Sequence, residues 1–193
     1  MRTGVFGGSF DPVHRGHLAV ARQAVAALKL DQVLFIPART QPLKSRGPYA
    51  APEHRVAMLK AAIEGHPAFL LDLRELGRSG PSYTVETLRE LILERPQDQL
   101  FLLIGADAAR DLPRWHEAEQ VGQLATIAVV PRPGALLPAL PASMVTVTLD
   151  PVDVSATMVR TAAAAEQSID QLVPKPVADY IAAHRLYRAG VAC

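Results

Sequence analysis

Short apolar runs alternate along the chain with longer stretches in which apolar residues recur every three or four positions. Continuous runs such as 33–36 and 100–104 are typical of strands that are buried on both faces of a sheet. Stretches such as 18–28 have the period of amphipathic helices. This alternation predicts an α/β fold, a Rossmann-like doubly wound domain with a mostly parallel sheet. We expect strands at 3–6, 33–36, 69–71, 100–104, 125–130 and 145–149, and helices over 18–28, 56–63 and 85–92 and from about residues 156 and 176.

Length, charge and cysteine content narrow the class of protein. The 193 residues contain no internal repeat and no linker, so we expect a single domain spanning 1–193. A net charge of +1 gives no reason to expect a nucleic acid or a membrane as partner. A single cysteine, Cys193, and no leader-like or membrane-spanning apolar run favour the cytoplasm. Nothing in the sequence decides between a monomer and a homodimer.

Two glycines and two histidines follow the first strand. Gly7 and Gly8 lack the Cβ atoms that would keep a ligand away from the backbone. His14 and His17 lie three residues apart at the start of the next helix, so their side chains should face the same way. The unpaired N–H groups of a helix start favour phosphate. Each feature alone occurs as often for structural reasons as for ligand binding, but together they predict a polyphosphate site.

Other unusual polar residues also follow strands or open a helix. In an open parallel sheet, ligands bind outside the carboxyl ends of the strands, where the strand order reverses. A helix start rich in hydroxyls, with an arginine one turn later, can also hold phosphate, although a plain helix cap is the structural alternative. Candidates of these two kinds are Gly105, Asp107, Arg132, Ser155, Thr157 and Arg160.

A resemblance to a known family covers almost the whole chain. Residues 7–18, with the sequence Gly-Gly-Ser-Phe-Asp-Pro-Val-His-Arg-Gly-His-Leu, resemble the signature of the His-x-Gly-His nucleotidyltransferase superfamily. Within it they are most similar to the bacterial nicotinate-nucleotide adenylyltransferases, which residues 82–88, 105–107 and 155–160 also match. The resemblance implies transfer of AMP from ATP to nicotinate mononucleotide, which gives nicotinate adenine dinucleotide and pyrophosphate in NAD biosynthesis.

The resemblance also implies roles for single residues. Backbone N–H groups around Tyr83 and Thr84 would bind the nicotinate carboxylate, and Trp115 would stack on the pyridine ring. Without the resemblance, Tyr83 and Thr84 would be read as part of a helix cap, and Trp115 as a partly buried core residue. The residues expected to contact ATP are Gly7, Gly8, Ser9, Phe10, His14, His17, Gly105, Asp107, Arg132, Ser155, Thr157 and Arg160.

Two positions depart from the family pattern. Ser9 stands where threonine is usual, a change that keeps the hydroxyl. Gln41-Pro42-Leu43-Lys44 stands where Pro-Pro-His-Lys is usual, so the lysine is kept and the histidine is lost. Lys44, together with Arg46, would close over the substrate phosphates from a long loop. We expect a position in the pocket wall for His116, and surface or capping positions for His54, His66 and His184.

The attacking group in such a reaction is a phosphate oxygen, which is largely ionised near pH 7 because its second pKa is about 6. The enzyme needs no general base and has to align two polyanions and neutralise developing charge. We expect His17 to act on the α-phosphate with His14 beside it, and Arg160 and Lys44 to act on the remaining phosphates. Mg²⁺ would be held mainly by the phosphates of ATP, with no metal site built by the protein.

Two other functions remain open. A related transferase of the same fold could act on phosphopantetheine or on an alcohol phosphate, although Tyr83, Thr84 and Trp115 favour a pyridine ring. A non-catalytic nucleotide-binding module would use the histidines only to bind. Within the family, backbone donors that face a carboxylate should disfavour nicotinamide mononucleotide, so we expect a preference for the acid.

Overall fold

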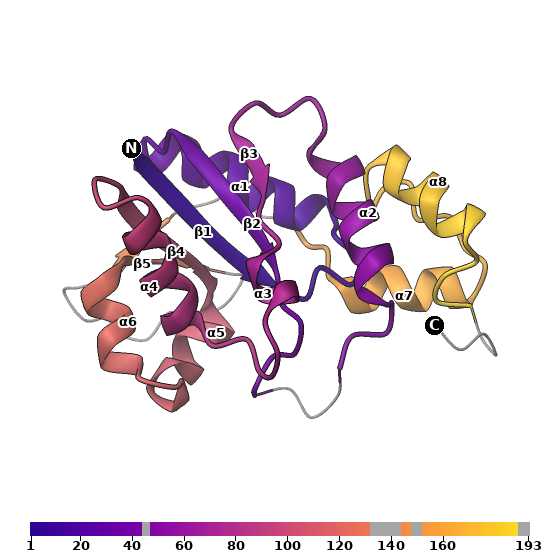
Figure 1. Cartoon of the computed structure of the whole chain (residues 1–193). Coiled ribbons are helices and arrows are strands. Elements are labelled where there is room, and N and C mark those ends of the chain that lie inside the picture. The colour runs from indigo at the N-terminus through magenta and orange to yellow at the C-terminus, as the bar shows by residue number, and fades with distance from the viewer. Residues whose placement is uncertain (44–46, 132–143, 148–151, 189–193) are drawn as a thin grey trace.

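The computed structural model describes residues 1–43, 47–131, 144–147 and 152–188. They form a six-stranded sheet with the order β3-β2-β1-β4-β5-β6 (Figure 1). Neighbouring strands are parallel throughout, and the order is that of a doubly wound Rossmann sheet. The predicted fold class is confirmed.

The strands are β1 (Arg2–Gly8), β2 (Gln32–Pro37), β3 (Phe69–Leu71), β4 (Gln99–Gly105), β5 (Thr126–Val130) and β6 (Met144–Thr146). The helices are α1 (Arg15–Leu28), α2 (Pro52–Ile63), α3 (Arg74–Gly77), α4 (Thr84–Glu94), α5 (Ala106–Asp111), η1 (Leu112–Arg114), α6 (Ala118–Leu124), α7 (Ala156–Ala164) and α8 (Lys175–Ala183).

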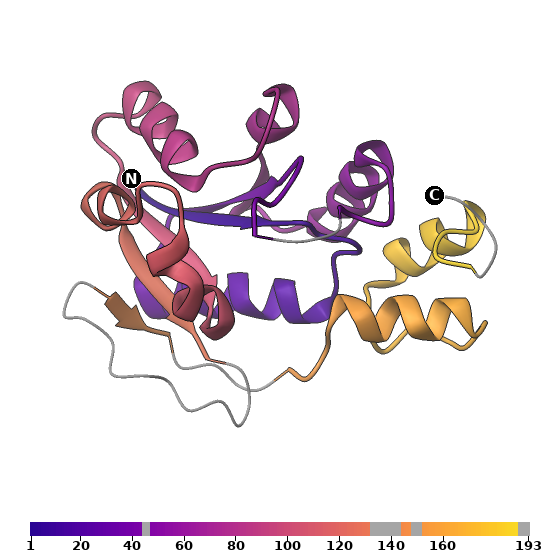
Figure 2. The ribbon, with the colours of Figure 1, turned by 90° about the horizontal axis from the view of Figure 1, so that it is seen from below.

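Helices cover both faces of the sheet. Successive side chains of a strand point to opposite faces, and β2 buries Val33 and Phe35 on one face and Leu34 on the other. The first face packs against α1, α2, α7 and α8, and the second against α4, α5 and α6. Figure 2 shows α1 and α4 on opposite sides of the sheet. Burial on both faces explains why these strands are continuous apolar runs in the sequence.

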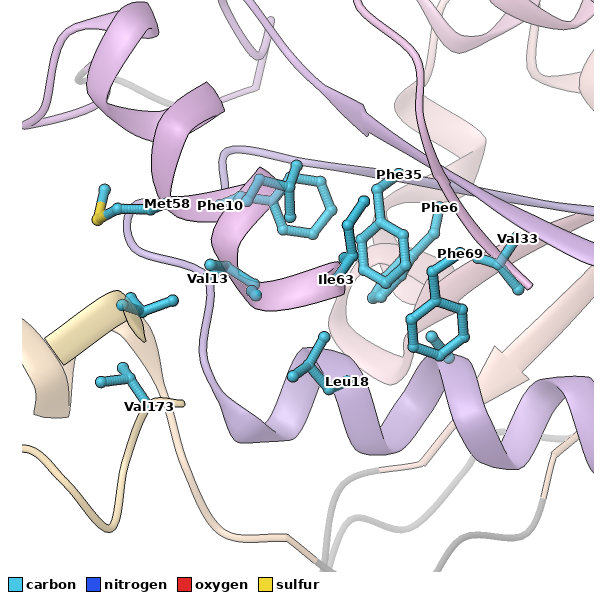
Figure 3. Close-up of a cluster of buried hydrophobic side chains, with 14 of the residues drawn as sticks. Phe6, Phe10, Val13, Leu18, Val33, Phe35, Met58, Ile63, Phe69 and Val173 are labelled. Carbon is cyan, nitrogen blue, oxygen red and sulfur yellow. The ribbon is translucent and has the colours of Figure 1, made fainter. Parts of the chain in front are cut away.

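Aromatic rings fill the first face beneath the loop that follows β1 (Figure 3). The ring of Phe35 lies 5.5 Å from that of Phe6 and 5.7 Å from that of Phe10, measured between centroids. Phe10 is only 1% exposed, and a Cβ atom on Gly8 would lie 3.2 Å from its ring. The side chain of Phe10 is therefore part of the core, which leaves its backbone to contact a ligand.

Four short helical elements have no counterpart in the pattern of the sequence. They are α3, α5, η1 and α6, of three to seven residues. Elements this short span at most two turns, so they show little periodicity. Strand β6 begins one residue before the predicted range 145–149, and positions 148 and 149 lie outside the described residues.

Two buried charged residues join the loops at the carboxyl end of the sheet. The guanidinium of Arg55, which is 1% exposed, donates to the carbonyl oxygens of Ser9 at 2.7 Å and Ala38 at 2.9 Å. Burial lowers the pKa of Arg55, and the nearby carboxylate of Asp11 acts in the opposite direction. Because Ser9 follows β1 and Ala38 follows β2, Arg55 holds the exits of the two strands together.

The carboxylate of Asp11 gathers three further groups. It accepts hydrogen bonds from the backbone N–H of Tyr49 at 2.5 Å, from the N–H of Ala50 at 3.1 Å and from the hydroxyl of Tyr187 at 2.7 Å. The loop before α2 and the segment after α8 are thereby fixed to the loop that follows β1.

Replacing Arg55 by methionine should lower the free energy of unfolding by about 3 kcal/mol, because two buried carbonyl oxygens lose their donor. Urea unfolding measures this change. Arg22→Met, at an exposed position of α1, is the control and should change stability by less than about 0.5 kcal/mol. A loss below about 1 kcal/mol for Arg55→Met would contradict the role given to this side chain.

Candidate active site

A cavity of about 620 Å³ lies at the carboxyl ends of β1, β2 and β4. The strand order reverses between β1 and β4, so the cavity occupies the position where open α/β sheets bind ligands. Gly7 and Gly8 form part of its wall, and a Cβ atom on Gly7 would meet nothing within 4 Å. A ligand can therefore approach the backbone of β1 closely.

The residues predicted to bind a pyridine nucleotide come together in this cavity. Tyr83, Thr84 and Trp115 all line it. Tyr83 is the residue immediately before α4, so the first N–H groups of that helix lie at the cavity. His116 also lines the cavity, with its ring centroid 4.4 Å from that of Tyr83, which confirms the predicted position in the wall.

The two histidines of the motif form one compact unit at the start of α1. Their ring centroids lie 3.7 Å apart, with 32° between the ring planes. The backbone N–H of His14 donates to Nδ1 of His17 at 3.2 Å. A backbone N–H can only donate, so Nδ1 must present its lone pair, and a neutral ring then carries its proton on Nε2. His17 is thereby set to donate a hydrogen bond from Nε2.

Aromatic packing and a glycine hold this unit in place. The ring of Phe10 meets that of His17 edge-on, at 5.0 Å between centroids. A Cβ atom on Gly16 would lie 3.0 Å from Nδ1 of His14 and 3.2 Å from the carbonyl oxygen of Val154. Only a residue without a side chain fits there comfortably. Gly16 therefore allows the segment before α7 to approach the start of α1.

The start of α7 lies beside the start of α1 (Figure 2). Ser155 is the N-cap of α7, as predicted, and its hydroxyl accepts from the backbone N–H of Met158 at 3.2 Å. The guanidinium of Arg160 donates to the carbonyl oxygen of Asp11 at 2.7 Å and to the hydroxyl of Thr157 at 3.1 Å. It also lies over the ring of Tyr49, at 4.4 Å from the centroid. The fold thus brings Arg160 beside the loop that leads to the histidines, and none of these three is among the described residues that line the cavity.

The remaining predicted residues are more dispersed. Ser9 donates to the side-chain oxygen of Gln41 at 2.9 Å, so the two positions that depart from the family pattern bind each other. Gly105 ends β4, and Asp107 lies in the first turn of α5, exposed and paired with Arg110. Gly105 and Asp107 are not among the described residues that line the cavity. The predictions for Lys44, Arg46 and Arg132 lie outside the described residues.

Glu75 is a cavity residue that the sequence did not single out. It belongs to α3, lines the cavity and is only 6% exposed. Burial raises the pKa of its carboxyl group, while the hydrogen bond from Thr87, the charge of Arg78 and the nearby Ser82 act in the opposite direction. A glutamate within a stretch as charged as 72–78 is typical of a surface, so no sequence signal marked it.

No group of three or more His, Cys, Asp and Glu side chains among the described residues is placed to bind a metal ion. No helix within the described ranges is both long and apolar enough to cross a membrane.

The chain is similar to a known family of proteins. The profile of the cytidylyltransferase-like family matches residues 5–162. A probable nicotinate-nucleotide adenylyltransferase of Roseiflexus sp. (strain RS-1) is 44% identical, over 96% of this chain and 97% of that protein. A protein of the same description from Thermus thermophilus is 45% identical, over 97% of this chain and 100% of its own length. Among solved structures, Plasmodium falciparum nicotinic acid mononucleotide adenylyltransferase complexed with NaAD has a TM-score of 0.76 at 19% identity, over 96% of this chain and 97% of that one. At that identity the likeness concerns the fold.

Glu75 should make stability depend on pH. Because burial raises its pKa, the folded protein binds the proton more tightly than the unfolded chain. The free energy of unfolding should therefore fall as the pH rises from the usual carboxyl value through the raised one. Urea unfolding of Glu75→Gln and wild type at two pH values measures this effect. The free energy of unfolding of the variant minus that of wild type should be larger at about pH 7.5 than at about pH 5. An equal difference between the two proteins at both pH values would contradict this.

Proposed function

The chain belongs to the cytidylyltransferase-like family and, within it, to the nicotinate-nucleotide adenylyltransferases, and we infer that it transfers AMP from ATP to nicotinate mononucleotide. The products are nicotinate adenine dinucleotide and pyrophosphate, in NAD biosynthesis. One structural observation supports this inference best. The glycines that end β1 and the three residues predicted for the pyridine nucleotide line a single cavity at the switch point of the sheet.

We propose that the start of α4 binds the carboxylate of nicotinate mononucleotide. The first N–H groups of a helix have no partner within it and lie at the positive end of its dipole. The start of α4 follows Tyr83, in the wall of the cavity. Backbone N–H groups donate to both oxygens of a carboxylate but cannot accept from the NH₂ of an amide. Trp115 would stack on the pyridine ring.

In the transfer step, a phosphate oxygen of nicotinate mononucleotide attacks the α-phosphorus of ATP. Negative charge grows on the α-phosphate, and a preorganised donor there lowers the barrier. Nδ1 of His17 already accepts from the N–H of His14, so its Nε2–H can donate to an α-phosphate oxygen. The ring then stabilises charge and is not the nucleophile. His14 would bind the neighbouring ATP phosphates.

The bond between the α-phosphorus and its bridging oxygen breaks, and pyrophosphate leaves with the electron pair. Arg160, together with Ser155 and Thr157 at the start of α7, would bind the β- and γ-phosphates. The guanidinium of Arg160 donates to the carbonyl oxygen of Asp11, three residues before His14, so it lies beside the loop that leads to the histidine pair. Lys44 and Arg46 would complete the phosphate site.

We further propose that ATP enters as its Mg²⁺ complex, with the metal held mainly by triphosphate oxygens. The reaction would take place in the cytoplasm, in a monomer or a homodimer, without a nucleic acid or a membrane as partner. Gel filtration with light scattering distinguishes the two oligomeric states.

Pyrophosphate release from MgATP tests the proposed function directly, with one acceptor present at a time. Nicotinate mononucleotide should support release, and nicotinamide mononucleotide should have a kcat/KM at least about tenfold lower, because the amide leaves backbone donors unpaired. Pyrophosphate release with phosphopantetheine, and with neither mononucleotide, would contradict the acceptor assigned here. ATP binding without release for any acceptor would instead favour a binding module.

Replacing His17 by alanine should lower kcat by about a hundredfold or more, because it removes a donor to the transition state. The KM for nicotinate mononucleotide should change little, since this ring faces the other substrate. His54→Ala is the matched control, because His54 bonds to Tyr180 on α8, away from the cavity. A kcat for His17→Ala within threefold or so of wild type would exclude the role given to this ring.

A further inference from the structure

Glu75 is a buried carboxyl group in the cavity wall that the transfer step does not use. It lies on α3, a helix of four residues between β3 and α4. An isolated helix of this length is unstable in water, so contacts with the rest of the protein must hold it.

Charged side chains fix α3 from two sides. The guanidinium of Arg39 donates to the carbonyl oxygen of Leu76 at 3.1 and 2.7 Å. Arg74 pairs with Asp72 at 2.7 Å and with Glu94 at 2.8 Å. These contacts bind the helix both to the loop after β2 and to the end of α4. The position of Glu75 in the cavity wall is therefore well defined.

The carboxylate of Glu75 binds the start of α4, directly after the Tyr83–Thr84 segment. Its Oε1 accepts from the hydroxyl of Thr87, in the first turn of α4, at 2.7 Å. Ser82, which comes directly before Tyr83, lines the same cavity and lies near enough to the carboxylate to act on its pKa. The hydroxyl oxygen of Ser82 in turn accepts from the backbone N–H of Arg39 at 3.0 Å.

Arg78 supplies the balancing positive charge. Its guanidinium donates to the hydroxyl of Thr87, the same hydroxyl that donates to Glu75. Arg78 also pairs with Glu86 at 3.2 Å and with Glu90 at 3.5 Å. Without such a cation, the carboxylate of Glu75 would repel an acidic substrate in the same cavity.

We propose that Glu75 is a positioning residue for recognition of the acid group of the substrate. By accepting from Thr87, it fixes the first turn of α4, and with it the backbone of Tyr83 and Thr84, so that their N–H groups meet the nicotinate carboxylate. A carboxylate suits this role because it only accepts hydrogen bonds. The inference rests on the proposed function.

Steady-state kinetics of Glu75→Ala test this role, with the KM of each substrate measured separately. We expect the KM for nicotinate mononucleotide to rise about tenfold, while the KM for ATP stays within about twofold. The preference for the acid over the amide should fall in parallel. Glu75→Gln, which keeps one accepting oxygen, should show a smaller rise. Glu64→Gln is the matched control, because Glu64 is exposed directly after α2 and does not line the cavity, and it should behave as wild type.

Thr87→Val provides a second test that keeps the shape of the side chain and all charges. It removes the hydroxyl that donates to Glu75 and should reproduce part of the rise in KM for nicotinate mononucleotide. Equal changes in both KM values, or an unchanged acid-to-amide preference in all variants, would overturn the role of Glu75 and leave the proposed function intact. A wild-type protein that forms no pyrophosphate with nicotinate mononucleotide would overturn both.

Discussion

The hydrogen bond from the backbone N–H of His14 to Nδ1 of His17 determines what the site can do. It exists because α1 begins directly after His14, so that the backbone of the N-cap and the third helical side chain meet. It assigns the lone pair to Nδ1 and leaves the proton on Nε2. The ring is thereby suited to donate to a phosphate and unsuited to attack one. The mechanism proposed for the adenylyl transfer depends on this assignment.

A buried polar scaffold holds the loop that leads from β1 to the histidine pair. Asp11 accepts from the backbone of Tyr49 and Ala50 and from the hydroxyl of Tyr187. Hydrogen bonds to charged groups contribute about 1.5–3 kcal/mol each. The loop before α2, the segment after α8 and the loop after β1 thus share one anchor. Arg160 joins the same loop through the carbonyl oxygen of Asp11.

Much of this arrangement could be predicted from the sequence, and the limits have physical reasons. The period of the hydrophobic pattern predicted the parallel sheet, and the residues at strand ends located the cavity. The presence of Tyr83 and Trp115 in that cavity was predicted only from resemblance to a family. Arg55 and Glu75 were missed because a charged residue is buried only when distant segments supply its partners, which no local pattern records. The Ser9–Gln41 hydrogen bond is another long-range contact of this kind.

The central claim is that the mononucleotide attacks ATP directly while the histidines only donate. The stereochemical course at the α-phosphorus tests it most directly, with ATP made chiral there by one sulfur atom. A single in-line displacement inverts the configuration, and this account predicts inversion in the dinucleotide product. Retention would contradict it, because two successive displacements would require an adenylylated enzyme intermediate, with a histidine ring as the evident nucleophile.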